Sequence, residues 1–415
     1  MLKTICAVFI VFLCFSIFPA YCADGDLLWE KIYDGGRTDQ SWNVAIDSKN
    51  NVIVTGYSQN VLNPDYCTIK YSPNGNSIWI KKFDSGHDDF SYGVATDSLD
   101  NIVVTGRVNN GRDNDYYTIK YGPSGNVLWE KIYDSGRADT AVGVAIDSFN
   151  NIIITGYSNN GNNDDYYTIK YDPNGNVLWK IAYDSGRSDI PSRVTTDSKN
   201  NIIITGYLHN GKNQDYLTVK YDSNGNMLWA QIYDSGRSEV GYDVATDNEN
   251  NVVVTGYSHN GLTQDYFVIK YDSNGNVLWT KRYDTGKNEV SQGIGIDSFG
   301  NIFITGYVIN ASNYSDIDCL TLKYSPNGDK IWEKIHDKGP TNFGWGVAVD
   351  SLNNIIVTGY FRGASNSDYF TIKYEGIPPV DTFSKRKLPL REIMSIVNYP
   401  GRPVGEFIRD KDRHD

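Results

Sequence analysis

The amino-acid sequence predicts an all-β protein, a seven-bladed β-propeller made of four-stranded antiparallel blades. Seven near-identical units of about fifty residues follow one another. Each unit holds four strand-like segments separated by Gly, Asn, Asp and Ser, and none has helical periodicity. The units begin at Gly25, Gly75, Gly125, Gly175, Gly225, Gly275 and Gly328. A single four-stranded sheet cannot bury both of its faces, whereas seven sheets arranged radially can.

The third unit illustrates the four strands. Residues 127–133 (VLWEKIY) are apolar and aromatic, and residues 143–147 (GVAID) are small. Residues 151–157 (NIIITGY) are β-branched, and residues 166–171 (YYTIKY) are aromatic, as is typical of strands. The Asn-Gly pair within residues 172–176 predicts a tight hairpin turn into the next unit.

The order of strands in a propeller blade fixes how the chain closes. The small segment 143–147 takes the inner position and the Trp-bearing segment the outermost. The last unit stops at Glu375 without an outer strand, while the first unit begins with a spare one at residues 27–33. We therefore expect the N-terminal strand to pair with residues 369–374 and close the ring, which removes exposed sheet edges. The propeller is predicted to span residues 23–375.

The two ends of the chain differ from the repeats. Residues 1–22 have a basic start, an apolar run over residues 5–18 and the cleavage-site pattern Ala20-Tyr21-Cys22, which together predict a signal peptide. Lipidation of that cysteine is the alternative. Residues 376–415 are expected to be a linker and a partly disordered tail, with a short helix over residues 390–397. The protein is therefore expected to be secreted or otherwise extracytoplasmic, in the periplasm or at the cell surface.

Charge and cysteine content narrow the classes of partner. The formal net charge is −12, so the surface repels nucleic acid and anionic lipid headgroups. The mature chain has no stretch that predicts a transmembrane segment. Its two cysteines, Cys67 and Cys319, fall in units that are not neighbours in a ring of seven, so no disulfide is expected. We expect a monomer.

The repeats resemble the seven-bladed β-propeller repeat (SBBP) family of bacterial secreted and cell-surface proteins. The resemblance is carried by residues 144–158 (VAIDSFNNIIITGYS) and 166–179 (YYTIKYDPNGNVLW), and it extends over about residues 25–375. It implies an extracytoplasmic location and no common reaction.

A second similarity concerns the tryptophans. Residues 171–179 (YDPNGNVLW) are similar to the tryptophan-docking motif of quinoprotein dehydrogenases. The same position holds Trp29, Trp79, Trp129, Trp179, Trp229, Trp279 and Trp332. Those enzymes typically have eight blades and often adjacent cysteines at the cofactor, and this chain has neither. We interpret the motif as inter-blade packing and expect no cofactor.

A candidate ligand site comes from one repeat position that varies. Just before the inner strand stand Trp42, Tyr92 and Trp345, in blades that are consecutive across the ring closure, and Phe90 and Phe343 lie two residues earlier. We expect these aromatic side chains on the face that carries the outer-to-inner strand connections, where they could bind sugar rings or apolar peptide side chains. The alternative is that they are wedges that fill the space between blades.

Charged residues at repeated positions give weaker signals. Arg193 and Asp243 stand at matching positions in neighbouring units on the opposite arc of the ring, and we include them among the candidate ligand-binding residues and expect them to form an ion pair. A ring of cations comprises Arg37, Arg137, Arg187 and Arg237. It could bind an anion, but an acid two residues after each arginine favours local ion pairs.

Repeated acids and two histidines complete the candidates. Acids recur before the third strand of every unit, as at Asp65 and Asp115, and are interpreted as turn or strand capping. His209 and His259 share a loop position, but no third zinc ligand is apparent. The sequence predicts no metal site, and no residue is assigned a catalytic role.

The sequence favours a binding or scaffold propeller with a glycan or peptide ligand, and it does not define a catalytic reaction. A residue present in all units is most simply explained by blade construction, and a unique active site should depart from that template. One alternative is a glycan-active lyase or hydrolase on a propeller scaffold. Another is a structural component of a surface layer.

Overall fold

The structure is a computed structural model, and it describes residues 24–311, 314–363 and 366–376. These residues form 28 β-strands and contain no helix. The expected signal peptide at residues 1–22, and the expected tail from residue 377 onward, lie outside the described residues.

The strands fall into four roles that repeat along the chain. The inner strands are β2 (Asp39–Ile46), β6 (Asp89–Thr96), β10 (Asp139–Ile146), β14 (Asp189–Thr196), β18 (Glu239–Thr246), β22 (Asn288–Ile296) and β26 (Thr341–Val349). The second strands are β3 (Val52–Gln59), β7 (Ile102–Asn109), β11 (Ile152–Asn159), β15 (Ile202–His209), β19 (Val252–His259), β23 (Ile302–Ile309) and β27 (Ile355–Arg362). The third strands are β4 (Pro64–Tyr71), β8 (Asn114–Tyr121), β12 (Asp164–Tyr171), β16 (Gln214–Tyr221), β20 (Gln264–Tyr271), β24 (Ile317–Tyr324) and β28 (Ser367–Tyr374). The outer strands are β1 (Leu27–Tyr33), β5 (Ser77–Phe83), β9 (Val127–Tyr133), β13 (Val177–Tyr183), β17 (Met227–Tyr233), β21 (Val277–Tyr283) and β25 (Lys330–His336).

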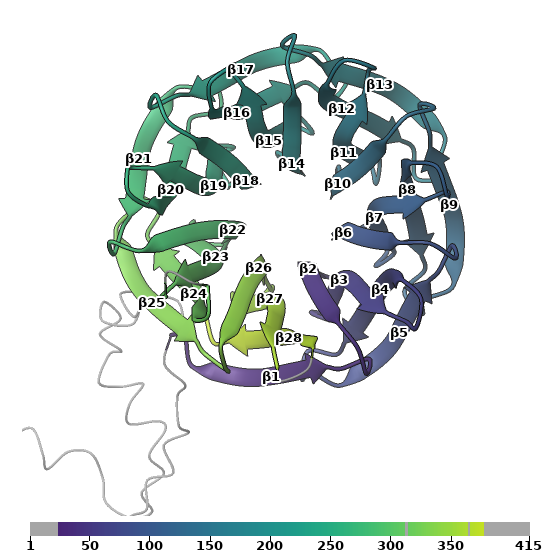
Figure 1. Cartoon of the computed structure of the whole chain (residues 1–415), viewed down its shortest axis with the longest axis horizontal. Coiled ribbons are helices and arrows are strands. Elements are labelled where there is room, and N and C mark those ends of the chain that lie inside the picture. Colours follow the sequence, from purple (N-terminus) through teal and green to yellow (C-terminus); the bar gives the residue numbers. More distant parts are fainter. Residues whose placement is uncertain (1–23, 312–313, 364–365, 377–415) are drawn as a thin grey trace, which may run out of the picture. The chain divides into compact units, whose positions relative to one another are not determined.

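Four consecutive strands make one antiparallel sheet, and the sheets stand around a central axis (Figure 1). We number them blade I (β2–β5), blade II (β6–β9), blade III (β10–β13), blade IV (β14–β17), blade V (β18–β21), blade VI (β22–β25) and blade VII (β26–β28 with β1). The ring is not one continuous hydrogen-bonded sheet. Blades VI and VII share a single parallel bridge between Ile317 and Thr341, and the other junctions rest on side chains.

The strand at the beginning of the described chain completes the last blade. β1 pairs with β28 in antiparallel register, from Leu27 opposite Tyr374 to Tyr33 opposite Tyr369. In Figure 1 the purple β1 lies against the yellow β28. The pairing that the sequence predicted between residues 27–33 and 369–374 is therefore confirmed.

Continuous apolar runs in the second strands reflect burial on both faces of a blade. Ile152 and Ile154 of β11 pack with Val103 of blade II, while Ile153 packs with Ile204 of blade IV. All of these side chains are fully buried, and each such aliphatic side chain contributes roughly 1.5–3 kcal/mol to folding. Neighbouring blades therefore supply the core that one sheet alone could not.

The inner strands begin earlier than the sequence indicated. In blade III the strand starts at Asp139, not at Gly143, because it contains a bulge between Ala141 and Gly143. Every inner strand has a register shift at this position. A bulge leaves one residue unpaired and turns its side chain, so the segment loses the alternation that marks a strand.

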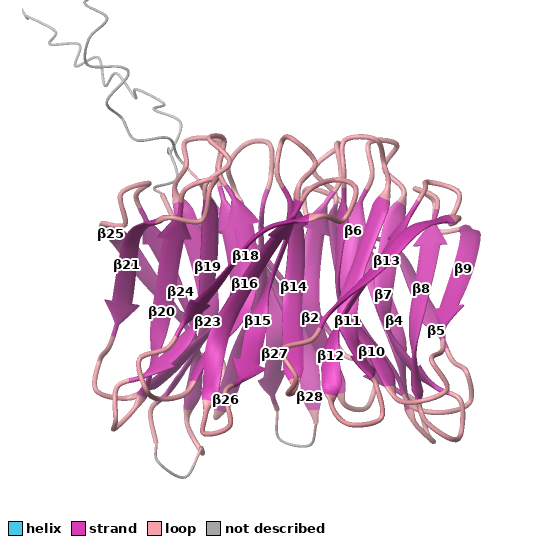
Figure 2. Cartoon of the chain, turned by 90° about the horizontal axis from the view of Figure 1, so that it is seen from above, coloured by secondary structure: helices cyan, strands magenta, loops and turns pink. Residues whose placement is uncertain are grey.

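The two ends of the ring are built differently (Figure 2). We call the end with the outer-to-inner connections, such as residues 34–38, the connection face. The opposite end, with turns such as Asp47–Asn51 and Ser72–Asn76, is the turn face.

On the turn face, a lysine and a tryptophan of one blade reach the next. Lys120 bonds the buried Asp97 at 2.9 Å and the carbonyl of Pro173 at 3.2 Å, and Trp129 donates its Nε1–H to that same carbonyl. The inter-blade interpretation of the tryptophans is thus confirmed.

No helix in the part of the chain that the structure describes is long and apolar enough to cross a membrane. Cys67 and Cys319 are both buried and free, as expected from their places in the ring.

Candidate functional site

The variable aromatic position lies at the bulge of each inner strand. The bulged residue is Trp42 in β2, Tyr92 in β6 and Trp345 in β26, so these residues lie within the strands and not before them. All three are partly buried, in the half of the strand nearer the connection face. A bulge re-aims its side chain out of the regular pleat, which gives this position its freedom to vary.

Blades I and II bring four aromatic rings together, and we call them the first aromatic cluster: Trp42, Tyr57, Phe90 and Tyr92. The rings of Trp42 and Tyr92 stack with centroids 4.7 Å apart and an interplanar angle of 12°. Phe90 lies 5.8 Å from Trp42 and 5.0 Å from Tyr57. The guanidinium of Arg107 lies 4.7 Å above the ring of Phe90. The three sequence-predicted residues of blades I and II are therefore neighbours, and Tyr57 is an addition.

Phe343 belongs to a second aromatic cluster, formed with Tyr307 and Tyr360. Its ring lies 4.9 Å from that of Tyr307 and 5.0 Å from that of Tyr360. Among the described residues, no ring contact joins Trp345 to the first aromatic cluster. The expected continuous surface over three blades is therefore two clusters.

A pocket of about 410 Å³ opens at the connection face where blades VI, VII and I meet. Phe343 and Tyr360 of the second aromatic cluster line it, together with Gln40, Thr38 and Arg362. Gln40 stands two residues before Trp42 on β2, so the pocket borders the strand that carries the first aromatic cluster. Aromatic side chains next to amide, hydroxyl and guanidinium groups suit a ligand that has both an apolar ring face and polar groups.

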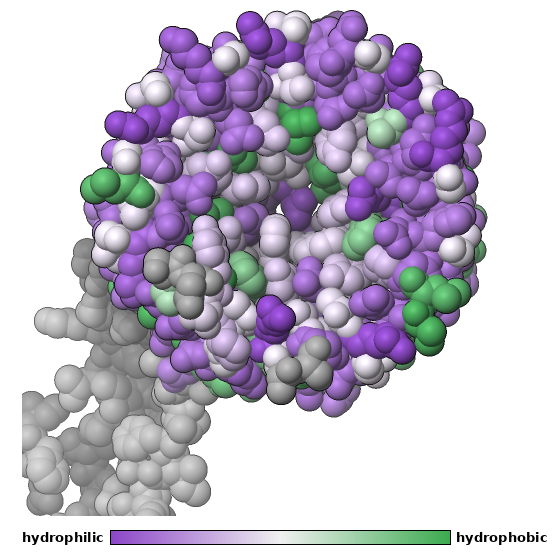
Figure 3. Space-filling model, in the orientation of Figure 1, coloured by the Kyte–Doolittle hydropathy of each residue, from purple (hydrophilic) through white to green (hydrophobic). Residues whose placement is uncertain are grey.

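The face of the ring turned to the viewer in Figure 3 is largely hydrophilic. Hydrophobic residues, shown in green, are few and scattered around a central hollow. No broad apolar patch covers this face, so a ligand here would have to meet polar groups as well as rings.

Arg193 and Asp243 form no direct salt bridge in the described structure, although their opposite charges still interact. Arg193 donates to the carbonyls of Val142 at 2.8 Å and of Trp42 at 3.3 Å, and so crosses the central channel to blade I. The Asp243 carboxylate accepts from the backbone N–H groups of Val244 and Ile294. Burial raises the pKa of Asp243 to about 6, although the charge of Arg193 opposes this rise.

The ring of arginines also differs from expectation. In the described structure, no carboxylate lies within ion-pairing distance of Arg37, Arg137, Arg187 or Arg237. The guanidinium of Arg137 lies over the loop at Gly161, and those of Arg187 and Arg237 lie over Gly211 and Gly261. The acids that were expected to neutralise these arginines accept hydrogen bonds from the backbone instead. Asp139, for example, accepts from the N–H of Ser135 at 2.7 Å.

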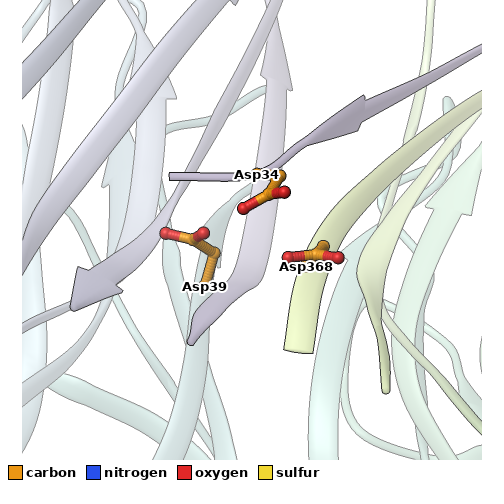
Figure 4. Close-up of side chains that lie close together, drawn as sticks. All are labelled: Asp34, Asp39 and Asp368. Atoms are coloured by element: carbon orange, nitrogen blue, oxygen red, sulfur yellow. The ribbon is translucent and has the colours of Figure 1, made fainter. Parts of the chain in front are cut away.

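Acids that appeared unrelated in the sequence meet at the blade junctions. Each acid cluster joins the start of a third strand, the end of an outer strand and the first residue of the next inner strand. The named clusters are Asp34, Asp39 and Asp368; Asp65, Asp84 and Asp89; Asp115, Asp134 and Asp139; Asp165, Asp184 and Asp189; and Asp215, Asp234 and Glu239. In each, one oxygen of every acid lies within 4.8 Å of an oxygen of the other two. Figure 4 shows the first of them.

The sequence carried a signal for these clusters. All three acids recur at fixed repeat positions, and antiparallel order places those strand ends on one face. The Nδ1 atoms of His209 and His259 each accept a hydrogen bond from a backbone N–H of their own loop.

Searches of protein-family models and of curated proteins give no match. Solved structures that match include β-propeller domains. The WD40 domain of Neurospora crassa Pan2 has a TM-score of 0.54 at 10% identity, covering 86% of this chain and 97% of its own. Chaetomium thermophilum Sqt1, bound to the N-terminus of ribosomal protein L10, has a TM-score of 0.52 at 9% identity, covering 85% and 100%. The propeller domain of the Pyrococcus furiosus Trilobed protease has 0.50 at 10% identity, covering 84% and 99%. At these identities the likeness establishes the β-propeller fold alone.

Proposed function

We propose that this protein is a secreted or surface-exposed binding propeller of the SBBP type, and that it binds a carbohydrate on its connection face. The ligand would lie over blades VII, I and II. The observation that carries the proposal is the near-parallel stack of Trp42 and Tyr92. The strand that carries Trp42 also supplies Gln40 to a pocket lined by Phe343, Tyr360 and polar groups. Aromatic faces cover the apolar side of a sugar ring with little loss of rotamer freedom, while amide and guanidinium groups bind its hydroxyls.

The asymmetry of the ring supports this place. The same bulge holds Val142 and Ser192 in blades III and IV, so construction of a blade does not require an aromatic residue there. Departures from a repeated template are where a unique function is expected. The structural alternative, an aromatic wedge between blades, predicts a loss of stability instead of a loss of binding.

Valine substitution at the bulge distinguishes these roles. Trp42→Val and Tyr92→Val replace the stacked rings by the residue that blade III already carries at this position. Tyr242→Val is the matched control, because Tyr242 is the bulge residue of blade V. With a glycan identified on an array, we expect the first two variants to weaken binding at least tenfold, about 1.4 kcal/mol, with melting temperatures close to that of the control.

Three results would contradict the proposal. One is unchanged glycan affinity in Trp42→Val. Another is a loss of about 3–5 kcal/mol in unfolding free energy for both variants, which is the cost of removing a core wedge. The third is capture of peptides but no glycan on parallel arrays, which would replace the carbohydrate by a peptide ligand.

A further inference from the structure

The acid cluster between blades II and III contains buried oxygens without donors. Asp115 and Asp139 are 3% and 0% exposed. Asn110 donates to Oδ2 of Asp115, and the N–H of Ser135 donates to Oδ2 of Asp139, both at 2.7 Å. The remaining Oδ1 of each acid is buried and has no hydrogen-bond partner in the described chain. A buried carboxylate oxygen left without a partner is destabilising, so a cation from outside the chain would stabilise this cluster.

The same feature recurs at other junctions. Asp39 of the cluster in Figure 4 is fully buried and its Oδ1 lacks a partner, while its Oδ2 accepts from the N–H of Gly35. The Oδ1 of the buried Asp65 likewise has no partner within the described residues. In these acids a backbone or amide donor holds one oxygen and leaves the other for a ligand. At the junctions with Asp189 and Glu239, by contrast, both oxygens of the acid accept hydrogen bonds.

The turn face shows how this protein neutralises buried acids when it supplies the cation itself. Lys120 lies 2.9 Å from Asp97 there. Burial alone raises the pKa of Asp97, but hydrogen bonds from Asn101 and Lys120 outweigh it, so the pKa ends below its ordinary value. On the connection face, no lysine or arginine of the described residues lies within ion-pairing distance of Asp39, Asp115 or Asp139. These acids therefore lack the direct ion pair that Lys120 gives Asp97.

Two blades place a cation at the corresponding position of the connection face. In blade I it is Lys82, which lies opposite Cys67 beside the Asp65 cluster and donates to Oγ of Ser58. In blade V, Nη1 of Arg282 forms an ion pair with Asp265. Asp265 stands at the start of the third strand, the position that Asp65 and Asp115 occupy in their clusters. The register of β21 against β20 places Arg282 opposite Phe267. The equivalent outer-strand residues in blades VII, II, III and IV are Ile32, Ile132, Ala182 and Ile232, which carry no charge.

We propose that the acid clusters beside Ile32 and Ile132, whose buried acids have an oxygen without a partner in the described chain, are Ca²⁺ sites that join neighbouring blades. Ca²⁺ binds oxygen ligands at about 2.3–2.6 Å, so two oxygens on one ion are at most about 5 Å apart. In every named cluster, one oxygen from each of the three acids lies within 4.8 Å of the others, so one Ca²⁺ ion can reach all three. Ca²⁺ accepts irregular sets of carboxylates and water, whereas Mg²⁺ demands near-octahedral geometry.

The test is calorimetric titration of the full chain with CaCl₂ after chelator treatment, alongside melting curves. Ile132→Arg is the central variant, because it copies Arg282 and gives the blade II cluster its own cation. We expect Ile32→Arg and Ile132→Arg each to lower the Ca²⁺ stoichiometry by one. The variant with both substitutions should melt at the same temperature with and without Ca²⁺. Asp139→Asn should also lose one site, and Ile335→Arg, at the equivalent position of blade VI, is the control that keeps them all.

Absence of Ca²⁺ binding by the unmodified protein up to millimolar concentration would overturn the proposal. So would an unchanged stoichiometry in Ile132→Arg when that variant melts as a folded protein. Equal affinity for MgCl₂ would overturn the assignment to Ca²⁺. Glycan binding by Trp42→Val is independent of all these results, because the aromatic clusters and the acid clusters share no residue.

Discussion

At the scale of single residues, the tryptophans show what one hydrogen bond contributes to a blade junction. Six of them donate their indole N–H to a carbonyl of the next blade, as Trp129 does to Pro173. Trp332 of blade VI has a buried Nε1 without an acceptor among the described residues. The next blade is completed by β1, so the hairpin turn that offers this carbonyl elsewhere is missing there.

Phenylalanine substitution isolates that hydrogen bond. Trp129→Phe removes an indole that is bonded, and Trp332→Phe removes one that is not. We expect Trp129→Phe to cost roughly 0.5–1.5 kcal/mol more in unfolding free energy than Trp332→Phe, since the loss of ring volume is common to both. Urea unfolding monitored by circular dichroism measures the difference. Equal losses would show that the indole N–H contributes nothing at the junction.

The paired acids of the turn face predict a response to acid. The pKa of Asp97 is lowered in the folded protein, because hydrogen bonds from Asn101 and Lys120 outweigh its burial. A lowered folded pKa gives stability that is present above the unfolded value of 3.8 and is lost as pH falls through the folded value. We expect the stability difference between the unmodified chain and Asp97→Asn to shrink below about pH 4. A difference that stays constant from pH 7 to pH 2.5 would contradict the pairing.

At the scale of strands, the sequence predicted what depends on local pattern and missed what depends on a bulge. The outer strand at residues 127–133 was predicted to the residue, because its turn residues and aromatic pattern are local. The inner strand was predicted four residues short, because the shift between Ala141 and Gly143 breaks the two-residue period. The bulge recurs in every inner strand of the ring, but the residue pattern of one blade does not indicate it.

Removal of β1 tests the last blade as an element. Deleting residues 24–34 leaves the edge of β28 unpaired and removes Trp29 and its bond to Pro73. We expect a broad, low-temperature transition in place of cooperative unfolding, measured by scanning calorimetry. A synthetic peptide of residues 24–34 should restore the sharp transition, and a scrambled peptide should not. A truncated chain that melts as sharply as the intact one would contradict the role of β1.

At the scale of the whole molecule, repetition explains both what could be predicted of the site and what could not. The aromatic residues were found because they break the repeat, as Trp42 does against Val142. The acid clusters were missed for the opposite reason: acids present in nearly every unit look like construction, and their three members are separated along the chain. Only the ring places Asp368 beside Asp34 and Asp39.

Arg193 shows the limit of pairwise inference. Its charge suggested a partner in the adjacent unit, but its length lets it reach the carbonyl of Trp42 on the other side of the ring. A side chain that points into a central channel has neighbours from blades distant in sequence. Such contacts follow from the ring and not from the repeat.

The pairing of β1 with β28 also sets the order in which the chain can fold. Blades I to VI consist of neighbouring hairpins and can form while synthesis proceeds, because their contacts are close in sequence. Blade VII needs both ends of the propeller, so β1 cannot pair until β28 has been synthesised. Until then, the unpaired edge of β1 is available to the third strand of another molecule, because the third strands are nearly alike. Intramolecular pairing of β1 with β28 therefore competes with strand exchange between molecules, whose rate depends on protein concentration. Dilution during refolding should favour the single-chain ring.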